Sequence, residues 1–265
     1  MLFKKKKQGI FVLLMIVACI MLGSGGLLVM VFVQDNLEEK YWKKLASLKD
    51  VENSVSDDSI LSEYSALYEQ NTDMIGWIKI DGTTIDYPVM QTKDSPEYYL
   101  RRNFNKEEEG GGTPFVDYRC DVLPKQSFNT IIYGHYTSGN TGFRWLLNYE
   151  AEKWYKEHKI IYFDTLQEKG KYEVIAAFYY DVTGATLSVK ENAITDETYE
   201  FYNYIEIDSL KGYKKFIDNI EKRQLYETDA KFKMTDHLIT LVCCAPKEYS
   251  DIEKNGRFIV IAKKI

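Results

Sequence analysis

Short apolar runs separated by turn residues make up most of the chain from Ile75 onward. The runs are rich in β-branched and aromatic residues, which suit the half-buried surface of a sheet. The first two flank Asp81-Gly82, a dipeptide that favours a tight hairpin turn, and Pro88 is expected to limit pairing after the second run. The pattern predicts a β-barrel or β-sandwich. Its strands are expected at residues 75–80, 83–87, 113–118, 130–133, 159–164, 172–181, 238–244 and 257–263.

Two segments have helical periodicity instead. Apolar residues in 209–225 recur at spacings of three and four, which predicts one long amphipathic helix with Asp208 or Ser209 as its cap. Residues 34–70 are polar, with apolar positions at similar spacings, and predict one or two helices. The plainest interpretation of this second segment is a solvated stalk that leads to a folded domain over residues 71–265.

The N-terminus has the pattern of a membrane anchor. Four lysines, Lys4 to Lys7, precede a stretch from residue 9 to residue 33 that has no charged residue. A stretch of this length can cross a bilayer as a helix. Because basic residues tend to stay on the inner side, residues 1–8 are expected in the cytoplasm and the rest of the protein outside the cell membrane.

Two other interpretations of this segment remain open. A cleaved signal peptide would have a shorter apolar region that ends at small residues, whereas here Leu27 to Val33 continues the run past the glycine cluster. A lipoprotein signal would use the sequence that ends at Cys19, but the chain stays apolar well beyond that residue.

Charge and cysteine usage limit the classes of partner and cofactor. The chain of 265 residues has a net charge of −6 and no basic stripe along its folded part, so nucleic acid is not expected as a partner. The four cysteines are Cys19, Cys120, Cys243 and Cys244. Their spacing is typical neither of a zinc site nor of a disulfide scaffold. A link from Cys120 to Cys243 or Cys244 remains open.

Residues with potentially catalytic side chains lie at the ends of the predicted strands. The apolar run 238–244 ends in Cys243 and Cys244, which should point to opposite faces of the sheet. Taken alone, this pair is more typical of small buried hydrophobes than of a site. Arg257 begins the next run, and antiparallel pairing would bring it beside Cys244. An arginine there favours a thiolate and offers donors to a developing oxyanion.

One of the three histidines also follows a strand. His135 comes directly after the run 130–133, on a loop position of the kind that often carries function. His158 lies in a charged run typical of a solvated helix face, and His237 only precedes the cysteine-bearing strand. Together with Cys244 and Arg257, His135 has the chemistry of a thiol catalyst.

At these residues the chain resembles the sortases, and within them class B. The family's TLxTC signature corresponds to residues 240–244, its histidine signature to 132–135 and its arginine signature to 256–260. Further class B similarity covers residues 71 to 265, in the order His, Cys, Arg. One departure is that Cys243 stands where the family has threonine, so that a second thiol replaces the hydroxyl next to the site.

The resemblance implies both a fold and a reaction. The fold would be mainly β, a closed eight-stranded sortase-type barrel with N-terminal helices and one long helix inserted before the cysteine-bearing strand. The reaction would be transpeptidation with Cys244 as nucleophile, His135 as proton partner and Arg257 as electrostatic helper. No metal or organic cofactor is implied.

The implied partners are secreted proteins with a C-terminal sorting signal, and a peptidoglycan precursor or pilin that supplies the acceptor amine. Two alternatives differ in function. A non-catalytic surface binding module would bury both thiols, and a thiol-reactive probe would leave them unlabelled. A papain-type peptidase would place its cysteine before its histidine, the reverse of the order here.

Overall fold

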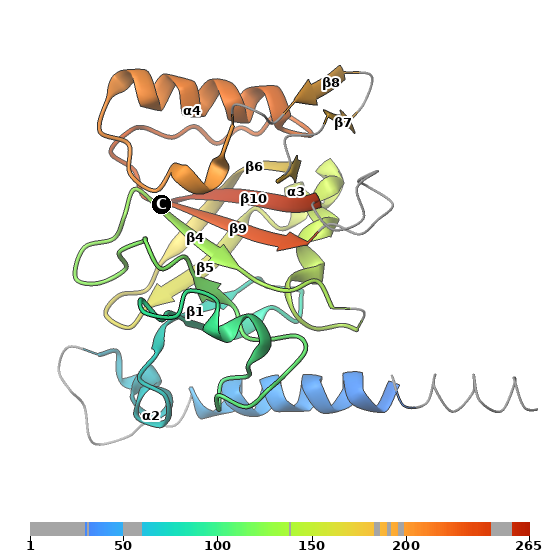
Figure 1. Cartoon of the computed structure of the whole chain (residues 1–265), viewed down its shortest axis with the longest axis vertical. Helices are drawn as coiled ribbons and strands as arrows, with labels where there is room; N and C mark the ends of the chain where they lie inside the picture. The colour runs from blue at the N-terminus through green and yellow to red at the C-terminus, as the bar shows by residue number, and fades with distance from the viewer. Residues whose placement is uncertain are drawn as a thin grey trace, which may run out of the picture. The chain divides into compact units, whose positions relative to one another are not determined.

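Eight strands close into a barrel in the computed structural model, which describes residues 30, 32–49, 60–137, 139–182, 186–189, 192–195, 199–244 and 256–265. The barrel order is β1-β2-β3-β4-β9-β10-β6-β5, with β5 pairing back to β1. Figure 1 shows this arrangement. The strands are β1 (Met74–Lys79), β2 (Asp86–Met90), β3 (Phe115–Val116), β4 (Asn129–Tyr133), β5 (Ile160–Thr165), β6 (Lys171–Asp181), β9 (Leu238–Cys244) and β10 (Gly256–Lys264). The prediction of a closed, mainly β barrel is confirmed.

Pro88 does not limit pairing as the sequence suggested. It lies inside β2 and opposite Trp77 of β1. Ile80 N donates to Ile85 O at 2.9 Å, and alternation from that pair puts Pro88 at a position without hydrogen bonds to β1. The ring therefore costs no hydrogen bond with β1, and β2 runs later than predicted because residues 83 and 84 belong to the turn.

Two further differences concern short elements. β3 spans only two residues, because Asp117 already begins a turn in which Cys120 N donates to its carbonyl oxygen at 3.0 Å. A separate two-stranded sheet of β7 (Thr186–Val189) and β8 (Asn192–Thr195) was not predicted.

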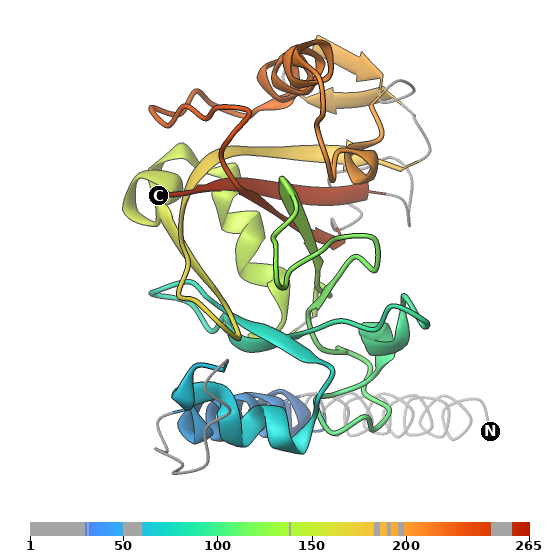
Figure 2. The same ribbon diagram turned by 90° about the vertical axis from the view of Figure 1, so that its left-hand side faces the viewer.

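Helices pack against two sides of the barrel. α4 (Leu210–Arg223) agrees with the predicted long helix, and its N-cap Ser209 accepts from Gly212 N at 3.1 Å. α2 (Ser62–Gln70) buries Tyr64, whose hydroxyl donates to Asp164 of β5 at 2.6 Å. Figures 1 and 2 show α4 beside β6 and α2 at the opposite side, near β1. The shorter helical elements are η1 (Tyr98–Arg101), η2 (Phe143–Glu150), α3 (Glu152–Glu157) and η3 (Phe201–Asn203).

The chain divides into two compact units, residues 1–41 and residues 42–265. Residues 32–48 are helical, and Leu45 and Trp42 of the second unit are buried. Together with the buried α2, this means that residues 42–49 and 60–70 contribute to the folded core and are more than a solvated spacer. The predicted anchor over residues 9–33 lies outside the described residues except for 30, 32 and 33. Within the described part of the chain, no helix is long and apolar enough to cross a bilayer.

Candidate active site

Strand register brings the three sequence-predicted residues to one edge of the barrel. β4 runs parallel to β9 with Tyr133 opposite Val242, so His135 and Cys244 each follow two residues beyond that pair. β9 runs antiparallel to β10, and Arg257 lies directly opposite Cys244. The predicted antiparallel pairing is therefore confirmed, and all three residues border one cavity of about 360 Å³.

Cys244 and Cys243 differ in exposure. Cys244 ends β9 and is partly exposed at the cavity, whereas Cys243 is only 1% exposed. Burial raises the pKa of the Cys243 thiol far above its ordinary range, and the nearby Arg257 opposes this only weakly. Cys243 is therefore a small buried residue of the core, whereas Cys244 is not fully buried. Both cysteines line the cavity, and Cys244 is the more exposed of the two.

Cys120 is a third free thiol, so the link to Cys243 or Cys244 that the sequence left open is not formed. It is fully buried and accepts from Ile131 N at 3.4 Å. Burial raises its pKa to about 12.

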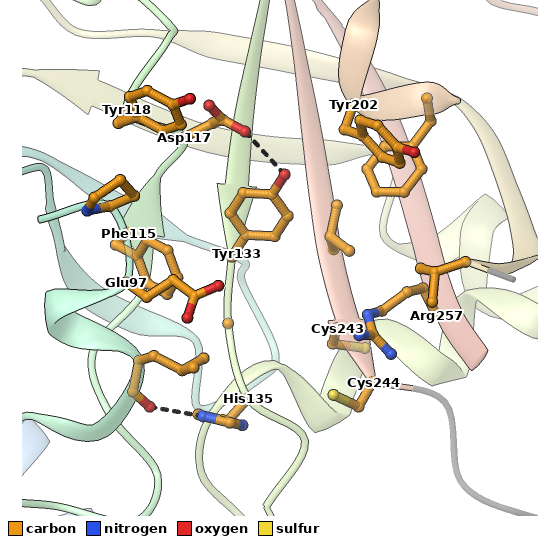
Figure 3. A pocket seen from close by; sticks show the side chains of 16 residues that line it. Glu97, Phe115, Asp117, Tyr118, Tyr133, His135, Tyr202, Cys243, Cys244 and Arg257 are labelled. Atoms are coloured by element: carbon orange, nitrogen blue, oxygen red, sulfur yellow. Dashed lines mark hydrogen bonds between the residues drawn. The ribbon is translucent and has the colours of Figure 1, made fainter. Parts of the chain in front are cut away.

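The ring of His135 is held by a backbone carbonyl. Its Nε2 lies 2.7 Å from the carbonyl oxygen of Leu100 in η1. A carbonyl oxygen only accepts, so Nε2 carries a proton and in the neutral ring Nδ1 is the acceptor. Figure 3 shows the other ring nitrogen and the Cys244 thiol directed into the same space.

Burial lowers the pKa of His135 below its ordinary value of 6.5. The Leu100 contact opposes the shift, while the positive charges of Arg101 and Arg257 add to it. The imidazole is therefore largely uncharged at neutral pH and able to take up a proton.

Two glycines fix the backbone of His135. Phe143 N donates to the His135 carbonyl at 2.8 Å. A Cβ on Gly142 would lie 2.5 Å from that carbonyl, and a Cβ on Gly134 would lie 2.5 Å from the Phe143 ring. The close approach of these two segments therefore depends on residues without side chains.

Arg257 lies at the edge of the site, near the start of β10. Its Nη1 donates to the carbonyl of Gly256 at 2.9 Å. Figure 3 shows the guanidinium beside the two cysteines, at the same end of the sheet as Cys244. A fixed cation here can stabilise negative charge that develops on a carbonyl oxygen near the thiol.

Aromatic side chains line the cavity away from Cys244. Figure 3 shows Asp117 and Tyr118 at this end, with Tyr133 between them and His135. The hydroxyl of Tyr133 donates to Asp117 at 3.0 Å. The aromatic members of the lining are Phe115, Tyr118, Tyr133, Phe201 and Tyr202. A cavity lined in this way can bind a short peptide segment through apolar contacts and a few oriented polar contacts.

The other two histidines lie elsewhere, as the sequence indicated. His158 caps α3 and stacks on Trp154 with ring centroids 3.6 Å apart, and it is less solvated than predicted. His237 flanks β9, with Nδ1 3.1 Å from the carbonyl of Ser127. Among the residues that the structure describes, no three His, Cys, Asp or Glu side chains form a group that could hold a metal ion.

Sequence reasoning missed two contributors to the site. Leu100 acts through its carbonyl, which leaves no side-chain signal in the sequence. Arg119 contacts Asp117 and the η3 segment. It lies in the turn after β3, and an arginine two residues after an aspartate has no distinctive sequence pattern of its own.

Comparison with known proteins supports a specific family. The Sortase domain model matches residues 78–265. Sortase B of Staphylococcus aureus is 28% identical over 261 residues, covering 98% of this chain and 98% of that protein. The structure of a Staphylococcus aureus sortase B-substrate complex matches with a TM-score of 0.72 at 27% identity, covering 88% of this chain and 98% of that one. A sortase B complexed with triglycine matches with a TM-score of 0.70 at 28% identity, covering 87% of this chain and 98% of that one.

Proposed function

This chain belongs to the sortase family as a class B cysteine transpeptidase, and from that premise we propose that Cys244 is its nucleophile, His135 its proton partner and Arg257 its electrostatic helper. One observation carries the proposal: the register of β4, β9 and β10 directs all three residues to one cavity. The alternative of a binding module with two inert thiols fits Cys243 but not the partly exposed Cys244.

In the first half-reaction, Cys244 Sγ bonds to the main-chain carbonyl carbon of the threonine in a sorting signal. The carbon–nitrogen bond of that amide breaks, and the thiol proton passes through His135 to the leaving amine. The product is a thioester between Cys244 and the secreted protein. Covalent catalysis thus divides one difficult amide exchange into two easier steps.

In the second half-reaction, an amine attacks the thioester carbonyl. The carbon–sulfur bond breaks, and the proton of the amine passes through His135 to the Cys244 sulfur. In both steps negative charge develops on the carbonyl oxygen, where the guanidinium of Arg257 would stabilise it. The lowered pKa of His135 supports this proton transfer, because a neutral ring can accept a proton before it donates one.

The donor substrate is a secreted protein with a C-terminal sorting signal, and the acceptor is an amine of a peptidoglycan precursor or of a pilin. A sortase B relative has been solved with substrate and another with triglycine, which supports a peptide donor and an amine acceptor. Residues 9–33 would anchor the enzyme in the cell membrane, with residues 1–8 in the cytoplasm and the catalytic domain outside. The lysine cluster and the uncharged stretch support this topology.

Mass spectrometry with a peptide library tests the residue assignment. The library keeps one threonine fixed and varies the residues around it. The wild-type enzyme should gain the mass of the acyl fragment on the peptide that contains Cys244, and added triglycine should discharge it. Cys244→Ala should form no adduct, because the neighbouring Cys243 thiol is buried and protonated.

Cys243→Thr is the matched control, since it restores the family's residue at the neighbouring position. It should acylate and turn over like the wild type. If Cys244→Ala still acylates while Cys243→Thr is inactive, the two thiols have the reverse roles and the proposed mechanism is wrong.

A further inference from the structure

Arg119 and Asp117 form a two-pronged ion pair at the end of the cavity away from Cys244. Arg119 Nε donates to Asp117 Oδ1 at 2.9 Å and Nη2 donates to Oδ2 at 2.8 Å. Asp117 is 5% exposed. Although burial opposes its ionisation, the Arg119 guanidinium lowers the pKa of Asp117 below its ordinary value. The pair is therefore charged at neutral pH and has a fixed geometry.

The same guanidinium also reaches the short helix η3 on the other side of the cavity. Nη2 donates to the carbonyl of Tyr202 at 2.8 Å, and Nη1 donates to the side chain of Asn203 at 3.3 Å. Tyr202 lines the cavity, as Asp117 does. Arg119 thus joins two walls of the cavity that are more than 80 residues apart in the sequence.

Other contacts hold the ends of this wall independently of Arg119. Phe201 packs edge-on against Tyr180 of β6, with ring centroids 4.9 Å apart. After η3, Asn129 of β4 donates from its side chain to the carbonyl of Tyr204 at 3.0 Å. Loss of Arg119 should therefore leave the fold and both ends of the η3 segment in place. Only the turn that carries Tyr202 should become more mobile.

We propose that Arg119 is a positioning residue that fixes the Tyr202 wall and thereby sets the affinity for the sorting-signal residues before the cleaved bond. This inference rests on the proposed function. The acyl-enzyme must retain that part of the signal while the leaving fragment departs and the amine enters. The cavity end between Asp117 and Tyr202 is walled by aromatic rings and is separated from the thiol. Its width depends on the Arg119 guanidinium, which links Asp117 to the backbone of Tyr202.

Lysine cannot replace this arginine in the same role. The planar guanidinium directs donors to Asp117, Tyr202 and Asn203 at once, whereas an ammonium acts as a compact point charge. Arg119→Lys therefore keeps the charge beside Asp117 and loses the contacts to η3. Arg119→Gln removes the charge as well.

The test measures kcat and KM for the library peptide that acylates the wild type best, and the rate at which iodoacetamide alkylates Cys244. Both Arg119 variants should raise KM about tenfold, the effect expected from losing one well-placed charged hydrogen bond. The kcat and the alkylation rate should stay within about twofold, because the thiol and its neighbours are unchanged. Lys169→Gln is the matched control, since it breaks the 3.0 Å ion pair with Glu63, away from the cavity.

An unchanged KM in Arg119→Lys would overturn the inference. It would also be overturned if the alkylation rate fell as much as the affinity, since that would indicate a general distortion of the site. If no library peptide acylates the wild type, the proposed function itself fails, and this inference fails with it.

Discussion

At the scale of single residues, the surroundings of His135 determine how it can act. Its Nε2 is committed to the carbonyl of Leu100, so proton exchange with sulfur or amine must use Nδ1. Burial lowers its pKa, and the charges of Arg101 and Arg257 act in the same direction. A histidine tuned in this way gives up its proton readily to a leaving amine.

NMR titration of the imidazole tests this account. The midpoint for His135 should lie below 6.5 in the wild type, because burial and two cations oppose the imidazolium. Arg257→Gln and Arg101→Gln should each raise the midpoint by removing a like charge. As the pH falls below about 6.5, the unfolded chain takes up this proton first, so the group progressively lowers the free energy of unfolding until the folded pKa is passed.

Lys222→Gln serves as the control for the titration, since Lys222 pairs with Asp218 on the exposed face of α4. It should leave the His135 midpoint unchanged. A wild-type midpoint at or above 6.5, or no response to either arginine substitution, would contradict the electrostatic account.

The sequence predicted the three residues that meet at one cavity better than the residues that hold them in place. Cys244, His135 and Arg257 were recognisable because they are rare or charged and lie at the ends of apolar strands. Strand alternation also predicted different environments for the two adjacent thiols. Leu100 and Arg119 act through a backbone carbonyl and through distant polar partners, and these contacts exist only after the barrel has brought the segments together.

At the scale of elements, η1 depends on a glycine turn. Gly112 adopts a φ of 59°, and a Cβ on it would lie 2.5 Å from the carbonyl oxygens of both Leu100 and Tyr99. Thr113 N donates to the Tyr99 carbonyl at 3.1 Å in the same turn. The turn therefore fixes the position of the carbonyl that holds His135.

Gly112→Ala should displace η1 and impair catalysis. The strained backbone and the two close contacts should cost about 1–3 kcal/mol of unfolding free energy. Because the Leu100 contact supports the charged imidazole, its loss should lower the His135 midpoint further. Thermal unfolding, NMR titration and the rate of transpeptidation measure these effects.

Gly110→Ala is a matched control two residues away. A Cβ at Gly110 would meet nothing within 4 Å, so its unfolding free energy should stay within about 0.5 kcal/mol of the wild type. Equal losses in the two variants would show that the turn is merely sensitive to added bulk, and that Gly112 has no special relation to η1.

Element prediction succeeded where periodicity was strong. The helix α4 and the strands β9 and β10 agree with the sequence patterns to within about two residues. The error at Pro88 arose because the proline was judged without knowing which pairing position it would occupy. The two-residue β3 fell short of its predicted range because polar turn contacts around Asp117 end it.

At the scale of the whole molecule, apolar and polar patterning alone left barrel and sandwich equally open. The parallel pairing of β4 with β9 joins strands about 110 residues apart, and no local signal specifies it. The resemblance to a known family supplied the closed barrel, and the structure confirms it. Physical reasoning from the sequence was therefore least able to predict the topology of the barrel.

The proposed membrane anchor makes a prediction for the N-terminus. The protein extracted from membranes should begin at or near Met1, because the uncharged stretch continues past the small residues that would mark a cleavage site. N-terminal sequencing checks this. A mature terminus shortly after Gly26 would indicate a signal peptide, and one at Cys19 with bound lipid would indicate a lipoprotein. Cys19→Ala separates the last case, since only a lipoprotein would lose its lipid.

The position of β10 between β9 and β6 also bears on protein synthesis. A ribosome that stops between residues 244 and 256 releases a chain that has Cys244 but lacks Arg257 beside it. The same truncated product leaves β9 and β6 without the strand that pairs with both, and their exposed edges would favour aggregation. Under the proposed mechanism, a nascent chain therefore becomes competent for acyl transfer only after β10 has been translated and has paired with β9.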